Sequence, residues 1–148
     1  MNNYNLKPYE DNDYDFVYDV KKIVYKDYVI ENYGSWDEDQ QKGMFKTYIE
    51  NAFNNIQIVL VEDKKAGFFD GCNILNGDYQ INNICLLPEF QGKGIGGKFL
   101  EKVIAEHKDQ NIHLKVFKQN RAKKLYEKLG FVVCDETETQ YIMIKEKY

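Results

Sequence analysis

The glycine-rich segment Gln91–Gly97, with the sequence QGKGIGG, restricts the folds open to this chain more than any other feature. Its glycines let the backbone approach a ligand closely and turn several N–H groups in one direction. An apolar, strand-like stretch precedes the segment, and a helical pattern that places Ile95, Phe99 and Val103 on one side follows it. A glycine loop between a strand and the start of a helix is typical of a site for phosphate or another anion.

Three phosphate-binding motifs compete for this segment. Gly92-x-Gly94-x-x-Gly97 matches the dinucleotide fingerprint, but that motif normally opens a fold, and here several strands precede it. The run from Gly92 to Lys98 matches most of a P-loop, but the next residue is Phe99 instead of the Ser or Thr that holds magnesium. The third motif, Gln91-x-x-Gly94-x-Gly96, has no such conflict.

Hydrophobic periodicity predicts one domain over residues 1–148, in the α/β class with a mixed α+β sheet and the order β-α-α-β-β-β-α-β-α-β-β. Before the loop we expect a strand at Leu6–Pro8, helices from Asp13 to Asn32 and from Trp36 to about Asn54, and strands at Ile56–Glu62, Ala66–Leu75 and Tyr79–Leu87. After it we expect a helix, a strand at Ile112–Phe117, a helix at Ala122–Leu129, and a hairpin of Phe131–Cys134 with Gln140–Lys145.

Turn residues and helix stripes add detail to this order. Turns at Asp63–Lys65 and Asn76–Asp78 make the three middle strands an antiparallel meander. A helix joins Tyr79–Leu87 to Ile112–Phe117, so these two strands should be parallel. The helices before the meander should bury two stripes: Phe16, Val20, Ile23, Val24 and Ile30 in the first, and Met44, Phe45, Tyr48, Ile49, Ala52 and Phe53 in the second.

Composition excludes several classes of function. The net charge is −4, which argues against nucleic acid as the main ligand. Residues 1–70 hold 14 acidic and 8 basic residues, whereas residues 71–148 hold 10 and 12, so the first half is suited either to a cationic acceptor or simply to solvated helix faces. The longest aliphatic run, Ile58–Val61, is too short to span a membrane, no leader pattern opens the chain, and its three cysteines are isolated. We therefore expect a cytoplasmic protein without a metal site.

Two segments resemble the GNAT N-acetyltransferase superfamily. Gln91-x-x-Gly94-x-Gly96 matches the family's Q/R-x-x-G-x-G/A motif, and residues 87–96 look like its signature loop almost throughout. Residues 120–131, with Ala122, Tyr126 and Gly130-Phe131, resemble a second family segment. The predicted layout is similar to that superfamily along the whole chain. The resemblance implies acetyl-CoA as the cofactor, with coenzyme A as the product.

The resemblance also implies a cofactor site. In the family the two parallel strands splay apart, and the pantetheine arm lies in the gap like an additional strand. Backbone groups of Leu86 and Leu87 would bond the arm. Asn120 would either bond the arm or cap the following helix. The pyrophosphate would lie on the backbone of the loop, which comprises Gln91, Gly92, Lys93, Gly94, Ile95, Gly96 and Gly97.

Catalytic and acceptor-binding residues are less strongly indicated. Tyr126 is the candidate that protonates the leaving thiolate, although it also fits a core aromatic on its helix. Many relatives carry a glutamate as general base where this chain has Gln80, Asn82 and Asn83, and none of these three takes a proton directly. The acceptor would meet Tyr33, Trp36, Glu38, Asn82 and Asn83. The alternative that we favour for Glu38 is a capping box with Ser35.

These observations predict direct transfer of the acetyl group from acetyl-CoA to a primary amine in a ternary complex. The acceptor would be a small-molecule or peptide amine. The alternative is a non-catalytic acyl-CoA-binding or sensor domain on the same scaffold, since the strand carboxylate is missing. Exposed edge strands and the 12 tyrosines make a homodimer compatible with the sequence. The identity of the amine, the general base and the length of the acyl chain are left open.

Overall fold

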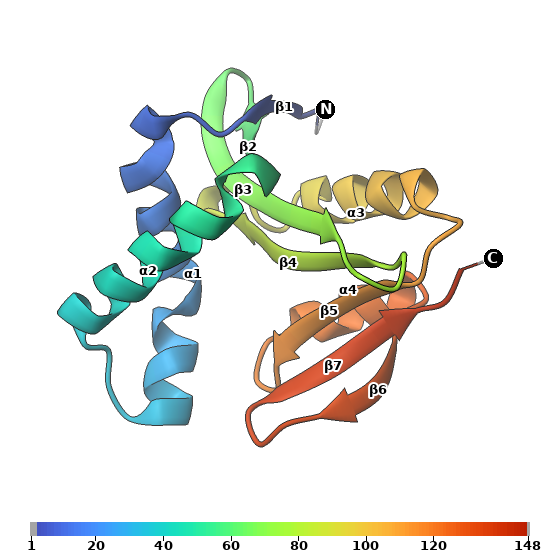
Figure 1. The fold of residues 1–148 in the computed structure, drawn as a ribbon. Helices are drawn as coiled ribbons and strands as arrows, with labels where there is room; N and C mark the ends of the chain where they lie inside the picture. Colours follow the sequence, from blue (N-terminus) through green and yellow to red (C-terminus); the bar gives the residue numbers. More distant parts are fainter. Residues whose placement is uncertain (1–2, 148) are drawn as a thin grey trace. The chain divides into compact units, whose positions relative to one another are not determined.

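The computed structural model describes residues 3–147 and has its helices and strands in the predicted order (Figure 1). Seven strands form a mixed sheet with the order β1-β2-β3-β4-β5-β7-β6, which confirms the predicted fold class. The strands are β1 (Asn5–Pro8), β2 (Ile56–Val61), β3 (Lys64–Asn73), β4 (Tyr79–Leu86), β5 (Ile112–Phe117), β6 (Val132–Glu136) and β7 (Gln140–Lys145). The helices are α1 (Tyr14–Tyr33), α2 (Glu38–Ala52), α3 (Ile95–Glu106) and α4 (Ala122–Lys128).

The chain divides into two compact units, and β3 and β4 each run from one into the other. The first unit contains the residues up to Asp70 and Asn83–Lys93, and the second contains Gly71–Asn82 and the residues from Gly94 onward.

In the first unit, α1 and α2 pack against β2, β3 and the end of β4. Their common core consists of Val17, Val20, Phe45, Ile49, Ile56, Ile58, Phe68 and Cys85. The Phe45 ring is its aromatic centre, with ring centroids of Tyr14 and Tyr18 at 5.0 and 5.2 Å in edge-on geometry. Such edge-to-face pairs add specific geometry to the buried apolar area.

Four residues of the predicted helix stripes are exposed instead of buried. Ile23 and Ile30 in α1 are 54% and 39% exposed. Met44 in α2 is 58% exposed, and Phe53, directly after α2, is 47% exposed. Each helix buries a narrow stripe, centred on Val17 and Val20 in α1, and a neighbour in sequence lies about 100° around the helix. The predicted stripes were therefore too wide.

The hairpin between β2 and β3 is tighter than predicted. Glu62 and Asp63 both have positive φ, 51° and 64°, as the two central residues of a two-residue hairpin turn require. Consequently β3 begins at Lys64 instead of Ala66, and it ends at Asn73 instead of Leu75.

In the second unit, α3 buries the predicted face of Ile95, Phe99, Leu100, Val103 and Ile104. The first residues of β4 and β5 form a parallel ladder from Tyr79↔Ile112 to Ile81↔Leu114, as the helical connection predicted. β5 also pairs antiparallel with β7 along its length, and β7 pairs with β6 across a bulge near Cys134 (Figure 1). All five residues of β6 are exposed, and β6 is the last strand in the sheet order.

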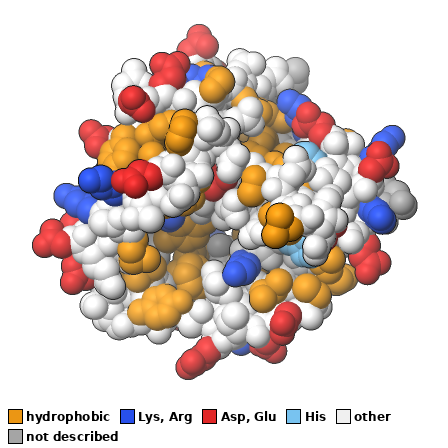
Figure 2. Space-filling view, viewed as in Figure 1, with side chains coloured by type: hydrophobic (Ala, Val, Ile, Leu, Met, Phe, Trp, Pro, Cys, Tyr) orange, Lys and Arg blue, Asp and Glu red, His pale blue; other side chains and the backbone are white. Residues whose placement is uncertain are grey.

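On the one face that Figure 2 shows, charged side chains of both signs are dispersed rather than gathered into one region. Figure 2 shows acidic side chains around the visible face, interspersed with Lys and Arg. Among residues 3–147, no helix has the length and apolar character needed to cross a membrane. Within the same range, no group of three or more His, Cys, Asp or Glu side chains is arranged to hold a metal ion.

Candidate active site

The glycine loop has the backbone geometry of an anion site. Gly92 and Gly94 have left-handed φ angles of 74° and 81°, and α3 begins directly afterwards at Ile95. The first backbone bond of the helix runs from the Lys98 N–H to the Gly94 carbonyl at 3.1 Å, so the N–H groups of the first turn precede the helical ladder. These N–H groups and the helix dipole favour a bound anion. Ile95 is 2% exposed and belongs to the buried face of α3, so it anchors the start of the helix.

The backbone N–H groups at the two ends of the strand that leads into the loop point to different neighbours. The Tyr79 N–H donates to the Asn111 carbonyl beside β5 at 2.9 Å, whereas the Leu87 N–H donates to the Ala66 carbonyl of β3 at 2.8 Å. In a regular strand, N–H groups an even number of residues apart point to the same neighbour. The alternation is therefore broken between Tyr79 and Leu87, which is the effect of a β-bulge and is frequent beside active sites.

This change decides which backbone groups at the end of β4 are available to a ligand. Leu87 has partners for both groups, because its carbonyl also accepts from the Phe90 N–H at 2.9 Å. Alternation turns the N–H and carbonyl of Leu86 away from β3. The Leu86 carbonyl accepts from the Gln91 side-chain amide at 2.8 Å, so strand and loop are linked directly. Of the two predicted pantetheine contacts, Leu86 has the more suitable orientation.

Asn120 and Tyr126 are both fixed by the second unit. The Asn120 side-chain oxygen accepts from the Ala122 N–H at 2.8 Å, so it caps the start of α4, one of the two roles considered for it. Tyr126 is 8% exposed, and its ring meets that of Phe131 edge-on with centroids 6.1 Å apart. The ring is thus part of the core whether or not its hydroxyl takes part in the reaction.

A polar cluster lies inside the first unit, where the sequence predicted apolar packing. The Tyr48 hydroxyl donates to the Asp70 carboxylate at 2.6 Å and accepts from the Asn83 side-chain amide at 3.0 Å. The Tyr25 hydroxyl donates to the Asn83 side-chain oxygen at 3.3 Å, and the Lys21 ammonium lies 4.3 Å from the centre of the Tyr48 ring. Asp70 is fully buried. We call these five residues the Asp70 cluster.

Burial shifts the ionisation of groups in and beside the Asp70 cluster. Burial raises the pKa of Tyr48 above its usual range, and the negative charge of Asp70 raises this pKa further. Burial lowers the pKa of the Lys21 ammonium, although the negative charge of Asp70 opposes this shift. Next to the cluster, burial raises the pKa of the Cys85 thiol to about 12, and this thiol donates to the Tyr25 hydroxyl at 3.5 Å.

Glu38 does not take part in the predicted capping box with Ser35. Asp37 is the N-cap of α2, and its carboxylate accepts from the Gln40 N–H at 3.0 Å. Glu38 instead accepts from the Lys22 ammonium at 2.9 Å and from the Trp36 indole N–H at 2.5 Å. These bonds, that from Lys22 first, lower the pKa of Glu38 to about 2. The capping prediction is wrong because Ser35 lies two residues before Asp37, the N-cap of a helix that begins at Glu38.

The structure thus brings together some predicted residues and separates others. Trp36 and Glu38 are hydrogen-bonded, as are Leu86 and Gln91. Asn83 joins the Asp70 cluster, whereas the adjacent Asn82 contacts the Cys72 sulfur at 3.6 Å. Tyr33 is 61% exposed at the end of α1. Sequence reasoning missed Asp70, which follows the core residue Phe68 by two positions and so faces the same side of β3.

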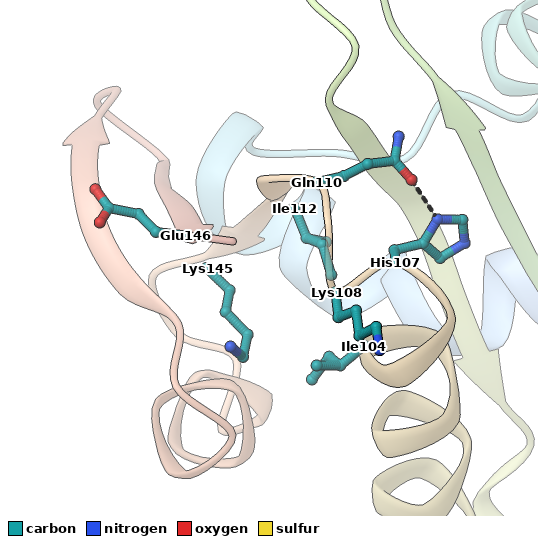
Figure 3. Close-up of a pocket in the computed structure, with 7 residues that line it drawn as sticks. All are labelled: Ile104, His107, Lys108, Gln110, Ile112, Lys145 and Glu146. Carbon is teal, nitrogen blue, oxygen red and sulfur yellow. Dashed lines mark hydrogen bonds between the residues drawn. The ribbon is translucent and has the colours of Figure 1, made fainter. Parts of the chain in front are cut away.

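A surface hollow in the second unit is not a candidate site. It is lined by Ile104, His107, Lys108, Gln110, Ile112, Lys145 and Glu146 (Figure 3). His107 is held there by a 2.7 Å hydrogen bond to Gln110, and its ring stacks on Tyr79 with centroids 3.7 Å apart. These two contacts explain the position of His107 without a ligand.

Comparison with known proteins identifies the class that this fold and loop define. Residues 54–133, more than half of the chain, match the family described as the acetyltransferase (GNAT) domain. The chain therefore belongs to the GNAT acetyltransferase family. At the level of the family, this confirms the predicted N-acetyltransferase class and acetyl-CoA as its cofactor.

Individual relatives are consistent with this assignment. The chain is 33% identical over 89 residues to the [ribosomal protein bS18]-alanine N-acetyltransferase of Haemophilus influenzae, a match that covers 58% of this chain and 61% of that protein. The PaiA N-acetyltransferase of Thermoplasma acidophilum, solved in complex with coenzyme A, has a TM-score of 0.75 at 20% identity over 97% of this chain and 99% of that one. The ribosomal-protein-S18-alanine N-acetyltransferase of Escherichia coli has a TM-score of 0.70 at 21% identity over 97% and 94%.

Proposed function

We propose that this protein transfers the acetyl group of acetyl-CoA directly to a primary amine held in the same complex. The observation that carries the proposal is the loop between β4 and α3, in which two left-handed glycines lead into a helix N-terminus. Membership of the GNAT family supports the same chemistry. Bound acetyl-CoA supplies an activated carbonyl carbon and a thiolate leaving group, and the protein supplies position and proton transfer.

The residues present fit an anionic cofactor. A Cβ on Gly92 would meet no atom within 4 Å, so the space above the loop is open, and its left-handed φ is strained for other residues. Lys93 is an exposed residue of the loop and adds a positive charge to it. The Leu86 backbone offers a polar edge for the amides of the arm, which would lie along β4 as an additional strand.

Acetyl-CoA is expected to raise the thermal stability of the protein. At about 100 times its dissociation constant, a ligand adds about 2.7 kcal/mol, which corresponds to about 5–10 °C in Tm for a domain of this size. ATP, NADH and dephospho-CoA at the same concentration serve as controls in a differential scanning measurement. If ATP or NADH raised the Tm and acetyl-CoA did not, the loop would be a nucleotide site and the acetyltransferase proposal would be withdrawn.

Tyr126 is proposed as the group that protonates the departing thiolate. Removing its hydroxyl in Tyr126→Phe should lower kcat about 100-fold, the lower end of what a single general acid contributes. The Tm increase caused by acetyl-CoA should be unchanged, because the buried ring is retained. Steady-state kinetics with the best acceptor would measure this effect, and a kcat within twofold of the wild-type value would leave Tyr126 with a purely structural role.

The first acceptor to test is a peptide with an N-terminal alanine. The relative from Haemophilus influenzae is named for alanine acetylation of ribosomal protein bS18, and it is 33% identical to this chain over the matched residues. The acid excess of residues 1–70 suits a polyamine or another small cationic amine as the second candidate. A panel containing the peptide, its N-methylated control, a lysine-bearing peptide and a polyamine separates these classes by mass spectrometry.

The sensor alternative makes a different prediction for the same panel. A non-catalytic domain would gain stability from acetyl-CoA and would acetylate none of the amines. Turnover of any amine above the uncatalysed rate contradicts this alternative.

A further inference from the structure

Asp70 differs from the other buried acid in what surrounds it. Among the described residues, Asp13 and Asp70 are the acidic side chains with no exposed surface. Asp13 forms ion pairs with Lys7 and Lys65 at 2.6 and 2.5 Å. Asp70 accepts instead from the Tyr48 hydroxyl at 2.6 Å. A buried carboxylate is costly unless its charge is compensated, and at Asp70 a tyrosine hydroxyl takes part in that compensation.

The Tyr48 hydroxyl is arranged to accept a further proton donor. A hydroxyl has one proton to donate and two lone pairs that accept. Its proton points to Asp70, and one lone pair accepts from the Asn83 amide at 3.0 Å. Tyr48 is partly exposed, and the second lone pair of its hydroxyl is the position that the relay proposed below assigns to the acceptor amine.

We propose that Tyr48 and Asp70 form the proton relay that deprotonates the acceptor amine. The inference rests on the proposed acetyl transfer and supplies the general base that the sequence lacks at Gln80, Asn82 and Asn83. Tyr48 is the catalytic residue, because its hydroxyl contacts the amine. Asp70 acts through Tyr48 and is a positioning residue that stores the proton.

The order of residues along β4 supports this location. The phosphates are proposed to bind at Gln91–Gly97, and the pantetheine arm to run past Leu86. An arm that continues along the strand in the same direction reaches the neighbourhood of Asn83 three residues further, about 10 Å at the rise of a strand. The reactive end of the arm would then lie beside the residue that holds the Tyr48 hydroxyl.

The ammonium form of the acceptor gives one proton to the Tyr48 oxygen as the Tyr48 O–H bond breaks and its proton passes to Asp70. The neutral nitrogen then forms a C–N bond with the acetyl carbon, the C–S bond breaks, and the sulfur leaves with the electron pair. The nitrogen loses a second proton to solvent, the sulfur takes a proton from the Tyr126 hydroxyl, and that hydroxyl is reprotonated from solvent, so that coenzyme A leaves as the thiol. Asp70 returns its proton to solvent along the same path.

The groups around the relay keep it in the required state. Burial and the charge of Asp70 raise the pKa of Tyr48, so its hydroxyl stays protonated. It therefore passes its proton to Asp70 only as it receives another from the amine. Lys21 on α1 interacts electrostatically with Asp70 and compensates part of its charge. The other titratable neighbours are Tyr25 on α1 and Cys85 on β4, and burial raises the pKa of Cys85 to about 12, which keeps that thiol neutral.

The test compares Tyr48→Phe and Asp70→Asn with wild type over pH 6–10. Without the relay, the amine must arrive already neutral, and its neutral fraction falls tenfold for each pH unit below its pKa. For a peptide N-terminus, with a pKa of about 8, the loss of kcat/KM should be about tenfold at pH 7 and about 100-fold at pH 6. Above pH 9 the variants should approach the wild-type rate.

Controls separate this effect from damage to the fold. Tyr48→Phe removes the hydroxyl that bonds the buried Asp70 carboxylate, and this variant could unfold for that reason. Asp70→Asn keeps the size of the side chain and an acceptor oxygen, so it tests the relay even in that case. Tyr14→Phe is the matched control, since its ring also packs on Phe45 and its hydroxyl lies outside the Asp70 cluster. Each variant should keep the acetyl-CoA-dependent rise in Tm.

The outcomes distinguish failure of the relay from failure of the proposed function. An active wild type whose variants lose nothing, or lose the same factor at every pH, overturns the relay and leaves the acetyl transfer standing. A wild type that binds acetyl-CoA and acetylates no amine overturns the proposed function itself. A loss that disappears at the pKa of the acceptor supports both.

Discussion

Gly67→Ala is expected to destabilise the protein by about 3 kcal/mol or more, a fall in Tm of at least about 6 °C. A Cβ on Gly67 of β3 would collide with the Cys85 carbonyl oxygen and lie 2.9 Å from the Leu86 Cα. Both are backbone atoms of β4, which cannot move aside as the end of a side chain can. Chemical denaturation with urea, followed by circular dichroism, measures the loss.

The same substitution should impair the cofactor site. Any relief of the clash pushes Leu86 away from β3, and Leu86 is linked to Gln91 at the start of the glycine loop. We therefore expect the acetyl-CoA-dependent rise in Tm to shrink along with the stability. Gly43→Ala is the matched control, because a Cβ there meets nothing within 4 Å and Gly43 lies inside α2. It should stabilise by about 0.5–1 kcal/mol, and a similar loss in both variants would contradict the steric argument.

Asp13→Asn is expected to cost about 2–3 kcal/mol at pH 7. Breaking a buried ion pair typically costs 3–5 kcal/mol, and we expect less here because the Lys7 and Lys65 side chains are 28% and 37% exposed and remain partly hydrated. Asp13 also accepts from the Glu10 N–H at 2.9 Å, so three donors lose a charged acceptor. Asp19→Asn on the exposed side of α1 is the control and should change stability by less than about 0.5 kcal/mol.

The cost of Asp13→Asn should depend on pH in a defined direction. Burial alone would raise the pKa of Asp13, but hydrogen bonds from Lys65 and Lys7 outweigh it, so the pKa is lowered in the folded protein. A lowered folded pKa gives stability that is present above the ordinary pKa of about 4 and is lost as the pH falls through the folded value. Urea unfolding should show a constant difference from pH 5 to 8 that shrinks below about pH 4. A difference of the same size at pH 3 would contradict this origin.

Local signals accounted for the parts of the fold that were predicted. The order of elements followed from the change of hydrophobic period, and the buried face of α3 followed from its spacing at Ile95, Phe99 and Val103. The anion-binding loop could be predicted because Gly92 and Gly94 adopt left-handed backbone conformations. This requirement for glycine depends on few distant contacts. The family resemblance depended on the same residues.

Features that depend on distant contacts or on competing signals were not predicted. Ser35 and Asp37 are both good cap residues, and sequence alone gave no reason to prefer the second. Ile23 and Met44 are apolar and close to the correct stripe, and their exposure depends on how closely α1 and α2 approach the sheet. The Asp70 cluster joins residues from α1, α2, β3 and β4, so its existence follows from tertiary packing.

The cysteines offer a way to time the opening of β4. Cys85 is 1% exposed with its pKa raised to about 12, whereas Cys134 on β6 is exposed. Thiol reagents attack the thiolate, so Cys134 should be modified in the native protein and Cys85 only during moments when the first unit opens. With Cys72 and Cys134 replaced by serine, the labelling rate of Cys85 becomes a clock for local unfolding next to the proposed cofactor edge. If acetyl-CoA slows the labelling of Cys85, the dependence of the rate on acetyl-CoA concentration gives the affinity of the site. The measurement needs no acceptor amine and no turnover.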